Sequence, residues 1–212
     1  MSDRYDASGL SEGQFEPGSN GHVLANRLHI TGPAEMAAQE LERLEQLYDY
    51  VLDVVTLDQR LSVQDLCAWH RRWLGDIYDW AGGYRSVNMG KDGFSFAAAA
   101  QIPRLMDKFD EDVLARYTPC QSMSEQGLAE AIAVVHVELI LIHPFREGNG
   151  RLSRLLATAM ALQAGWPVLD FTSWDSDKEA YFSAIQAGLD DYQPMIERVT
   201  RILRDSAGAD AP

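Results

Sequence analysis

Apolar residues recur at helical spacing along most of this chain, and this periodicity constrains the fold more than any other feature. Leu41, Leu44, Leu47, Tyr48 and Val51, for example, fall on one face of a helix expected from residue 34 to about residue 55. The same reasoning predicts helices at 62–74, 97–117, 124–142, 148–165, 178–189 and 194–204. The period changes only in 81–96, where glycines surround a short run that is typical of a β-hairpin. We therefore expect a mainly α fold with one hairpin.

The chain is expected to form one domain, because it contains no internal repeat and no linker-like segment. Its 212 residues are enough to bury one core. Glycines and prolines break up residues 1–33, which we expect to be an irregular N-terminal arm. The domain then extends over 34–205, and 206–212 are expected to be a frayed tail.

The charge balance excludes several classes of partner. The net charge is −14, whereas 46% of the residues are hydrophobic, which favours a folded acidic protein over a disordered one. An acidic surface repels polyanions, so we expect no direct nucleic-acid binding and no binding to an anionic membrane. A nucleoside triphosphate could bind only at a local island of positive charge.

The chain start and the cysteines indicate the compartment. Residues 1–20 contain no apolar stretch behind a basic start, so no leader sequence is expected. Cys67 and Cys120 are isolated and form neither a disulfide framework nor a zinc site. The sequence thus predicts a reduced, cytoplasmic protein.

Residues 143–154, His-Pro-Phe-Arg-Glu-Gly-Asn-Gly-Arg-Leu-Ser-Arg, form the expected positive island, with three arginines against one glutamate. The island lies at a helix start, where unpaired N–H groups favour an anion. Glycines 148 and 150 flank Asn149 and have no side chains. The main chain can therefore approach a phosphate closely at Gly148 and Gly150. Arg151 and Arg154 are three residues apart, so they share one helix face.

Three other residues of the segment have candidate roles. His143 precedes a proline, which disfavours helical backbone, so the preceding helix should end there. Its imidazole could accept a proton from an attacking hydroxyl. Glu147 is suited to Mg²⁺, which binds few protein carboxylates plus phosphate oxygens. Phe145 is expected to be an apolar anchor. Each feature alone has an ordinary structural explanation, but their combination favours a phosphate site.

This segment resembles the signature of Fic-domain proteins, His-Pro-Phe-x-(Asp/Glu)-Gly-Asn-Gly-Arg-x-x-Arg, at every position. The likeness extends to residues 74–82, which are similar to the segment that leads into the family's hairpin, and in all covers about 24–202. The resemblance implies the Fic fold, a helical bundle with a β-hairpin flap over the active site.

The resemblance also implies an activity: transfer of AMP from ATP to a hydroxyl group of a target protein, by a protein adenylyltransferase. His143 would be the general base, and Glu147 would hold Mg²⁺ at the α- and β-phosphates. The nucleotide would be bound by an anion hole and by the arginines, that is, by Gly148, Asn149, Gly150, Arg151 and Arg154. ATP and Mg²⁺ are the implied cofactors.

By the same resemblance, the flap at Val87–Phe96 would bind the target by strand addition. Lys91 and Asp92 at its tip are candidates to approach the nucleotide, although they could equally be solvated turn residues. Self-modification is a further expectation. The target's identity and the oligomeric state are not indicated by the sequence.

Residues 8–13 fit a family pattern for self-inhibition, (Ser/Thr)-x-x-x-Glu-(Gly/Asn), through Ser8 and Glu12. In this hypothesis Glu12 pairs with Arg154 and ATP binds unproductively. The alternative is that 8–13 is a surface arm. The layout also resembles bacterial toxins whose brake is a separate antitoxin, so an antitoxin is a candidate partner.

Alternative functions remain open at the sequence level. The transferred group could be UMP, GMP, phosphocholine or phosphate, although phosphate-transferring relatives depart from Gly-Asn-Gly. De-AMPylation is a further alternative if Glu12 lies in the site. A non-catalytic nucleotide-binding module is disfavoured by the intact His143 and Glu147. His70 and His136 are expected to be core or surface histidines.

Overall fold

The computed structural model describes residues 11–209, which divide into two compact units. Both units are discontinuous in sequence. The first contains the chain up to Val54, Val63–Met106 and Ile142–Asn149. The second contains Val55–Ser62, Asp107–Leu141 and the residues from Gly150 onward. The signature segment 143–154 therefore contributes its first part to one unit and its last part to the other.

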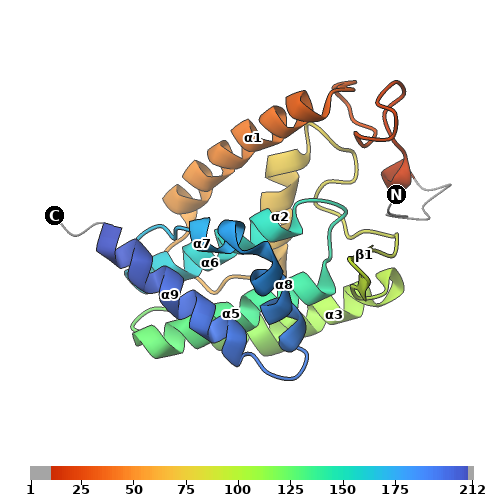
Figure 1. The fold of residues 1–212 in the computed structure, drawn as a ribbon. Coiled ribbons are helices and arrows are strands. Elements are labelled where there is room, and N and C mark those ends of the chain that lie inside the picture. The colour runs from red at the N-terminus through yellow and green to blue at the C-terminus, as the bar shows by residue number, and fades with distance from the viewer. Residues whose placement is uncertain (1–10, 210–212) are drawn as a thin grey trace. The chain divides into compact units, whose positions relative to one another are not determined.

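The first unit is built on α1 (Pro33–Val54) and α2 (Val63–Leu74), which pack together (Figure 1). The buried face of α1 carries Met36, Glu40, Leu44, Leu47 and Val51, at the spacing expected of an amphipathic helix. The buried Trp73 of α2 donates its indole N–H to the carbonyl of Glu40 at 2.8 Å. Tyr78 donates to the Glu40 carboxylate at 2.8 Å. The one carboxylate on the buried face of α1 is thus hydrogen-bonded, as burial requires.

The predicted hairpin is present and short. Strands β1 (Gly90–Lys91) and β2 (Phe94–Ser95) pair antiparallel, with Lys91 opposite Phe94. Between them, Asp92 and Gly93 have φ angles of 50° and 82°. Positive φ at both central residues is characteristic of a type I′ hairpin turn, which Asp-Gly favours. The part of the arm at 11–32 is irregular apart from a 3₁₀ turn, η1 (Ser11–Gly13), and a single bridge between Phe15 and Leu24.

The second unit is helical. Its central helix, α5 (Glu125–Ile142), is buried on nearly all sides, which explains its continuous apolar sequence. The second unit also contains a π-helical stretch at Phe109–Leu114, α4 (Ala115–Tyr117), α6 (Asn149–Gln163) from Gly150 onward, α7 (Thr172–Ser176), α8 (Lys178–Ala187) and α9 (Gln193–Ala209). The first unit contains η2 (Ala99–Gln101) and α3 (Ile102–Lys108) as far as Met106.

Two features at the C-terminal end differ from the sequence expectation. The short helix α7 was not expected, because five residues between polar flanks give no periodic signal. Helix α9 continues to Ala209, beyond Ser206, where we expected a frayed tail. Ser206 is buried, and its hydroxyl oxygen accepts the N–H of Asp170 at 3.0 Å. This contact secures the end of the helix.

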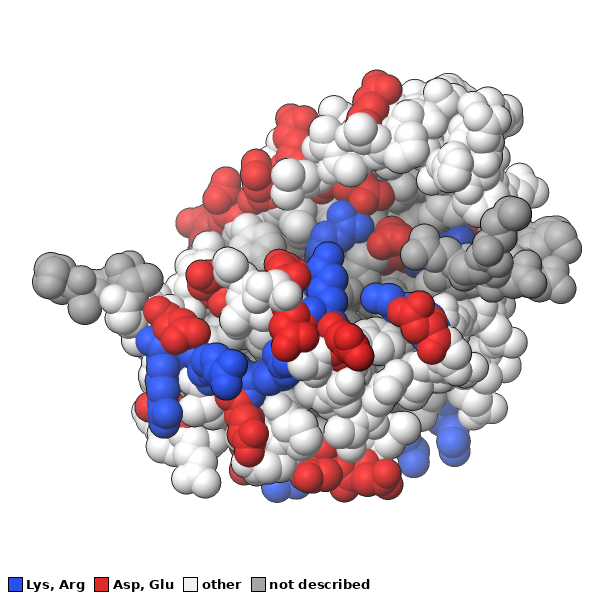
Figure 2. All heavy atoms as spheres, viewed as in Figure 1, with Lys and Arg blue, Asp and Glu red and all other residues white. Residues whose placement is uncertain are grey.

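The acidic net charge is distributed unevenly. Figure 2 shows acidic side chains along α1, where Glu35, Glu42, Glu45, Asp49 and Asp53 are exposed. It also shows basic side chains over α9, which carries Arg198, Arg201 and Arg204. The acidic body that the composition suggested therefore has a basic stretch on α9 as well as the signature segment. None of the helices within 11–209 combines the length and apolar character that a membrane span requires.

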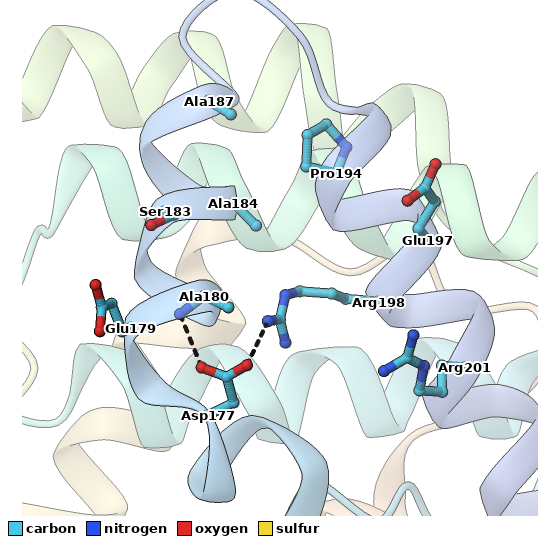
Figure 3. Close-up of a pocket in the computed structure, with 10 residues that line it drawn as sticks. All are labelled: Asp177, Glu179, Ala180, Ser183, Ala184, Ala187, Pro194, Glu197, Arg198 and Arg201. Carbon is cyan, nitrogen blue, oxygen red and sulfur yellow. Dashed lines mark hydrogen bonds and ion pairs between the residues drawn. The ribbon is translucent and has the colours of Figure 1, made fainter.

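A pocket of about 610 Å³ lies between α8 and α9 (Figure 3). Small side chains of α8, such as Ala180, Ser183 and Ala184, form one wall. Arg198 of α9 reaches across to Asp177, with 3.7 Å between the charged groups. No residue of the signature segment lines this pocket.

One prediction concerns the buried His136 of α5, which lies in an aromatic cluster. Its Nε2 is 2.8 Å from the Tyr181 hydroxyl, and its ring is 4.9 Å from that of Trp174. Burial lowers the pKa of His136 from 6.5 to about 3, and the charge on Arg154 acts in the same direction. Between these two pH values the unfolded chain binds the extra proton, so stability must fall as the pH falls.

We expect the free energy of unfolding in urea to decrease between pH 6.5 and pH 4 with a contribution of up to about 1.4 kcal/mol per pH unit from His136. His136→Gln should remove that part of the slope, whatever it does to the absolute stability. His22→Gln, which replaces an exposed histidine in the same way, is the matched control substitution. An identical pH dependence in wild type and His136→Gln would contradict the assignment.

Candidate active site

Helix α5 ends at Ile142, and His143 follows it in a left-handed backbone conformation with φ of 52°. The end of the helix before Pro144 confirms the sequence prediction. The left-handed conformation costs a residue with a Cβ about 1–2 kcal/mol, so surrounding contacts must hold it. One such contact is the main-chain N–H of Arg85, which donates to the carbonyl of Pro144 at 2.8 Å.

The imidazole of His143 is half-buried against the hairpin segment. The ring of Phe96 is stacked on it, with the ring centroids 3.8 Å apart and the planes inclined by 9°. Phe96 directly follows strand β2. The hairpin segment therefore contacts the candidate general base itself.

Asn149 braces the loop 143–148. Its side-chain oxygen accepts the N–H of Phe145 at 2.9 Å, and its side-chain nitrogen donates to the carbonyl of Phe145 at 2.8 Å. Asn149 is buried, and Phe145 is fully buried, as expected of an anchor. The Asn149 side chain is thus committed to the loop, so an anion at this helix start would be met by main-chain N–H groups.

The buried His70 of α2 is a site residue that the sequence did not reveal. Its ring stacks on Phe145 with centroids 4.1 Å apart. Nδ1 accepts the N–H of Gly82 at 2.8 Å, which places the proton on Nε2, and Nε2 donates to the carbonyl of Glu147 at 3.0 Å. His70 is therefore more than a core histidine, because it fixes the main chain beside Glu147.

Gly148 has a packing role in addition to any close approach of phosphate. Its φ is 83°, and a Cβ there would lie 2.5 Å from Cζ3 of the Trp73 ring. Only glycine fits this position without a shift of Trp73. By contrast, a Cβ on Gly150 would meet no atom of residues 11–209 within 4 Å. The N–H of Gly148 donates to the Glu147 carboxylate at 2.9 Å.

In the second unit, the first turns of α6 carry both signature arginines. Gly150, Arg151 and Leu152 follow Asn149 in the first turn, whose N–H groups have no partner within the helix. Arg154, one turn on, forms a bidentate ion pair with Asp175 of α7, at 3.0 and 2.9 Å. Its guanidinium also lies 5.3 Å from the centroid of the Phe171 ring. Arg154 is 23% exposed, which leaves part of the guanidinium accessible to a ligand.

Arg146 was counted in the positive island, but its side chain is buried. Its Nε donates to the main-chain carbonyl of Glu12 at 2.8 Å. The carboxylate of Glu12 in turn accepts from the N–H of Ser86 at 2.6 Å and from the Ser86 hydroxyl. Glu12 thus links the arm to Ser86, which precedes the hairpin, and to Arg146 of the loop 143–148. Ser8, the other residue of the predicted inhibitory pattern, lies outside the described residues.

Lys91 and Asp92 are exposed at the hairpin tip. Their approach to a nucleotide stays a prediction.

The donor set fits Mg²⁺ bound mainly through phosphate. Within residues 11–209, no group of three or more His, Cys, Asp and Glu side chains is arranged to hold a metal ion. Glu147 offers one half-buried carboxylate beside the helix start. One carboxylate plus phosphate oxygens is the usual Mg²⁺ arrangement at nucleotide sites, so Glu147 could hold the ion only with a nucleotide present.

Comparison with known sequences gives consistent matches. The model of the Fic/DOC family matches residues 60–161. The probable protein adenylyltransferase y4lH of Sinorhizobium fredii is 31% identical over 77% of this chain and 81% of its own length. Protein adenylyltransferase VbhT of Bartonella schoenbuchensis is 29% identical over 72% of this chain, and Fic of Nematostella vectensis is 27% identical over 84%. The match covers only 31% and 41% of these last two proteins.

Solved structures agree on the fold. The BepC protein of Bartonella tribocorum, with bound AMPPNP, superposes with a TM-score of 0.72 at 21% identity, over 92% of this chain and 97% of that one. An N-terminal Fic domain from Bartonella quintana, with bound ADP, gives 0.74 at 22% identity, over 91% and 95%. These likenesses support the predicted helical fold with a hairpin flap.

The packing of Gly148 leads to a test on stability alone. Gly148→Ala should destabilise the protein by about 1–3 kcal/mol, because the added methyl group overlaps Trp73 and the left-handed backbone is strained. Gly150→Ala is the matched control: it lies in a helix with open space around it, and should be neutral or stabilise by up to about 1 kcal/mol. Urea unfolding measures both, and equal effects would refute the packing role.

Proposed function

Because the chain belongs to the Fic/DOC family, we propose that it is a protein adenylyltransferase that moves AMP from ATP to a hydroxyl group of a target protein. The observation that carries the proposal is the complete signature, with His143 on the loop after α5 and both arginines on the first turns of α6. The names of the relatives supply the transferred group.

In this reaction His143 accepts the proton of the attacking hydroxyl. The oxygen attacks the α-phosphorus of ATP, the bond between the α-phosphorus and the bridging oxygen breaks, and pyrophosphate leaves with the electron pair. Positioning and charge neutralisation account for most catalysis of this kind. The half-buried ring of His143 is already fixed by Phe96 before any substrate binds.

The helix start binds the phosphates. The first-turn N–H groups of α6, from Gly150 onward, and the positive end of the helix dipole face an anion. Arg151 and Arg154 add positive charge on the same helix. Arg154 can reach a terminal phosphate with the N–H groups that Asp175 does not occupy, since a guanidinium carries more donors than one carboxylate uses.

Mg²⁺ would be held by Glu147 together with phosphate oxygens, and when bound it neutralises charge on the α- and β-phosphates. The contacts of His70 with the Glu147 carbonyl and of Gly148 with its carboxylate orient this side chain. The flap at Val87–Phe96 would receive the target, whose backbone could pair with the short strands.

The proposal predicts a specific adduct. A cell lysate incubated with the protein, Mg²⁺ and a mixture of nucleotides should contain peptides that carry AMP on a hydroxyl side chain, as measured by mass spectrometry. His143→Ala should abolish the adduct, with a loss of at least about a hundredfold. A UMP, GMP or phosphocholine adduct would change the substrate but keep the chemistry. An adduct that forms equally with His143→Ala would refute the mechanism.

We further propose Glu12 as a regulator of this activity. Its carboxylate bonds Ser86 in the first unit, and Arg154 bonds Asp175 in the second, so each has a partner within its own unit. Regulation by Glu12 would require its carboxylate to leave Ser86 and pair with the guanidinium of Arg154. Antitoxin control is the alternative that the layout suggested.

Glu12→Gly is expected to raise self-modification with labelled ATP. The variant keeps the main-chain oxygen that Arg146 binds and removes only the carboxylate. Ser86→Ala serves as the control for the anchoring contact, because it removes the hydroxyl donor and leaves Glu12 in place. If Glu12→Gly leaves the rate unchanged, self-inhibition through Glu12 is wrong.

A further inference from the structure

The side chain of Arg85 is almost completely buried, with 2% of its surface exposed. It lies between the glycines that precede the hairpin and the hairpin itself. Burial of a permanent cation is costly unless its donors are used. Arg85 uses its donors on main-chain carbonyls.

The carbonyls lie at the two places that the reaction needs to hold together. Nε donates to the carbonyl of His143 at 2.6 Å, and Nη2 donates to that of Ile142 at 3.3 Å. Nη1 donates to the carbonyl of Val87, and Nη2 also donates to that of Ala97 at 2.6 Å. The same guanidinium therefore contacts the end of α5 and both ends of the hairpin segment.

The contacts at the end of α5 act on a backbone that needs them. The last carbonyls of a helix have no partner within it, and Ile142 and His143 lie at this end. His143 is also in the disfavoured left-handed conformation, with φ of 52°. Hydrogen bonds from a charged donor are roughly twice as strong as neutral ones, so Arg85 can compensate for this conformation.

The contacts at the hairpin act on the imidazole ring. Ala97, whose carbonyl Arg85 binds, directly follows Phe96. Phe96 stacks on the ring of His143 at 3.8 Å. Arg85 thus holds the main chain of His143 on one side and the residue beside its stacking partner on the other.

We propose that Arg85 is a positioning residue that sets the orientation of the His143 imidazole through these carbonyl contacts. The proposal rests on His143 being the general base of the proposed function. Arg85 supports only the part of the site that contains His143. The part that contains Glu147 and Asn149 is held by His70 and Phe145. Loss of Arg85 should therefore impair the chemical step and spare nucleotide binding.

The first experiment compares Arg85→Lys with wild type. Lysine keeps the charge but lacks the planar fork, so it cannot reach carbonyls on both sides. We expect kcat to fall about ten- to hundredfold, as for a misplaced catalytic group, with KM for ATP changed less than about twofold. The control is Arg27→Lys, an exposed arginine that also donates to a carbonyl, that of Gly75, and that should leave both constants unchanged. A parallel change in kcat and KM, or no change in kcat, would overturn the proposal.

Chemical rescue provides a second variant. Arg85→Ala should lose activity. Guanidinium ion added at a sub-denaturing concentration should occupy the vacated space and raise the activity of this variant at least about tenfold. Wild type and His143→Ala should show no such gain. Retained ATP affinity in a binding assay establishes that Arg85→Ala is folded. Folded protein without rescue would contradict the proposal, and if this variant fails to fold, Arg85→Lys decides.

A spectroscopic readout is independent of any transfer activity. The chain has 5 histidines, so the imidazole signals of isotope-labelled protein can be assigned by single substitutions. Arg85→Lys should shift or broaden the signal of His143 and leave that of His70 in place. An unchanged His143 signal would overturn the proposal even if activity falls. If wild-type protein transfers nothing, the proposed function fails, and the histidine signals still decide the role of Arg85.

Discussion

The conformation of the loop between α5 and α6 depends on the reciprocal hydrogen bonds between Asn149 and the main chain of Phe145. They join the loop to Asn149, the first residue of α6, and both partners are buried. The stack of His70 on Phe145 and the bond of His70 to the Glu147 carbonyl then fix the loop against α2. Because these contacts engage main-chain atoms, they hold the loop that carries His143 and Glu147 without using the imidazole of His143 or the carboxylate of Glu147.

Local features of the site were predictable from the sequence because their causes are local. A residue before proline disfavours helix, so the end of α5 at Ile142 followed from Pro144. Glycine after aspartate favours a tight turn, which Asp92 and Gly93 form. Helical periodicity likewise located α1 and α5 within a few residues.

The supporting residues were not predictable, because their partners are distant in sequence. His70 lies 77 positions from Glu147, and Arg85 lies 58 positions from His143. No periodic or short pattern encodes such pairs. Asp175 on α7 belongs to a helix too short to be detected, so its ion pair with Arg154 could not be anticipated either. The roles of the signature residues came from the family resemblance, whereas their support came from the structure.

The link between Arg146 and the arm has a consequence for any shortened form of this protein. Arg146 donates to the main-chain oxygen of Glu12, an acceptor that every amino acid supplies. Side-chain substitutions at position 12 therefore preserve this bond, whereas removal of the backbone up to Gly13 would leave a buried guanidinium without that acceptor, in the middle of the catalytic loop. Chain trimming and point substitution at the same position would thus perturb the loop through different physical causes, and one cannot stand in for the other.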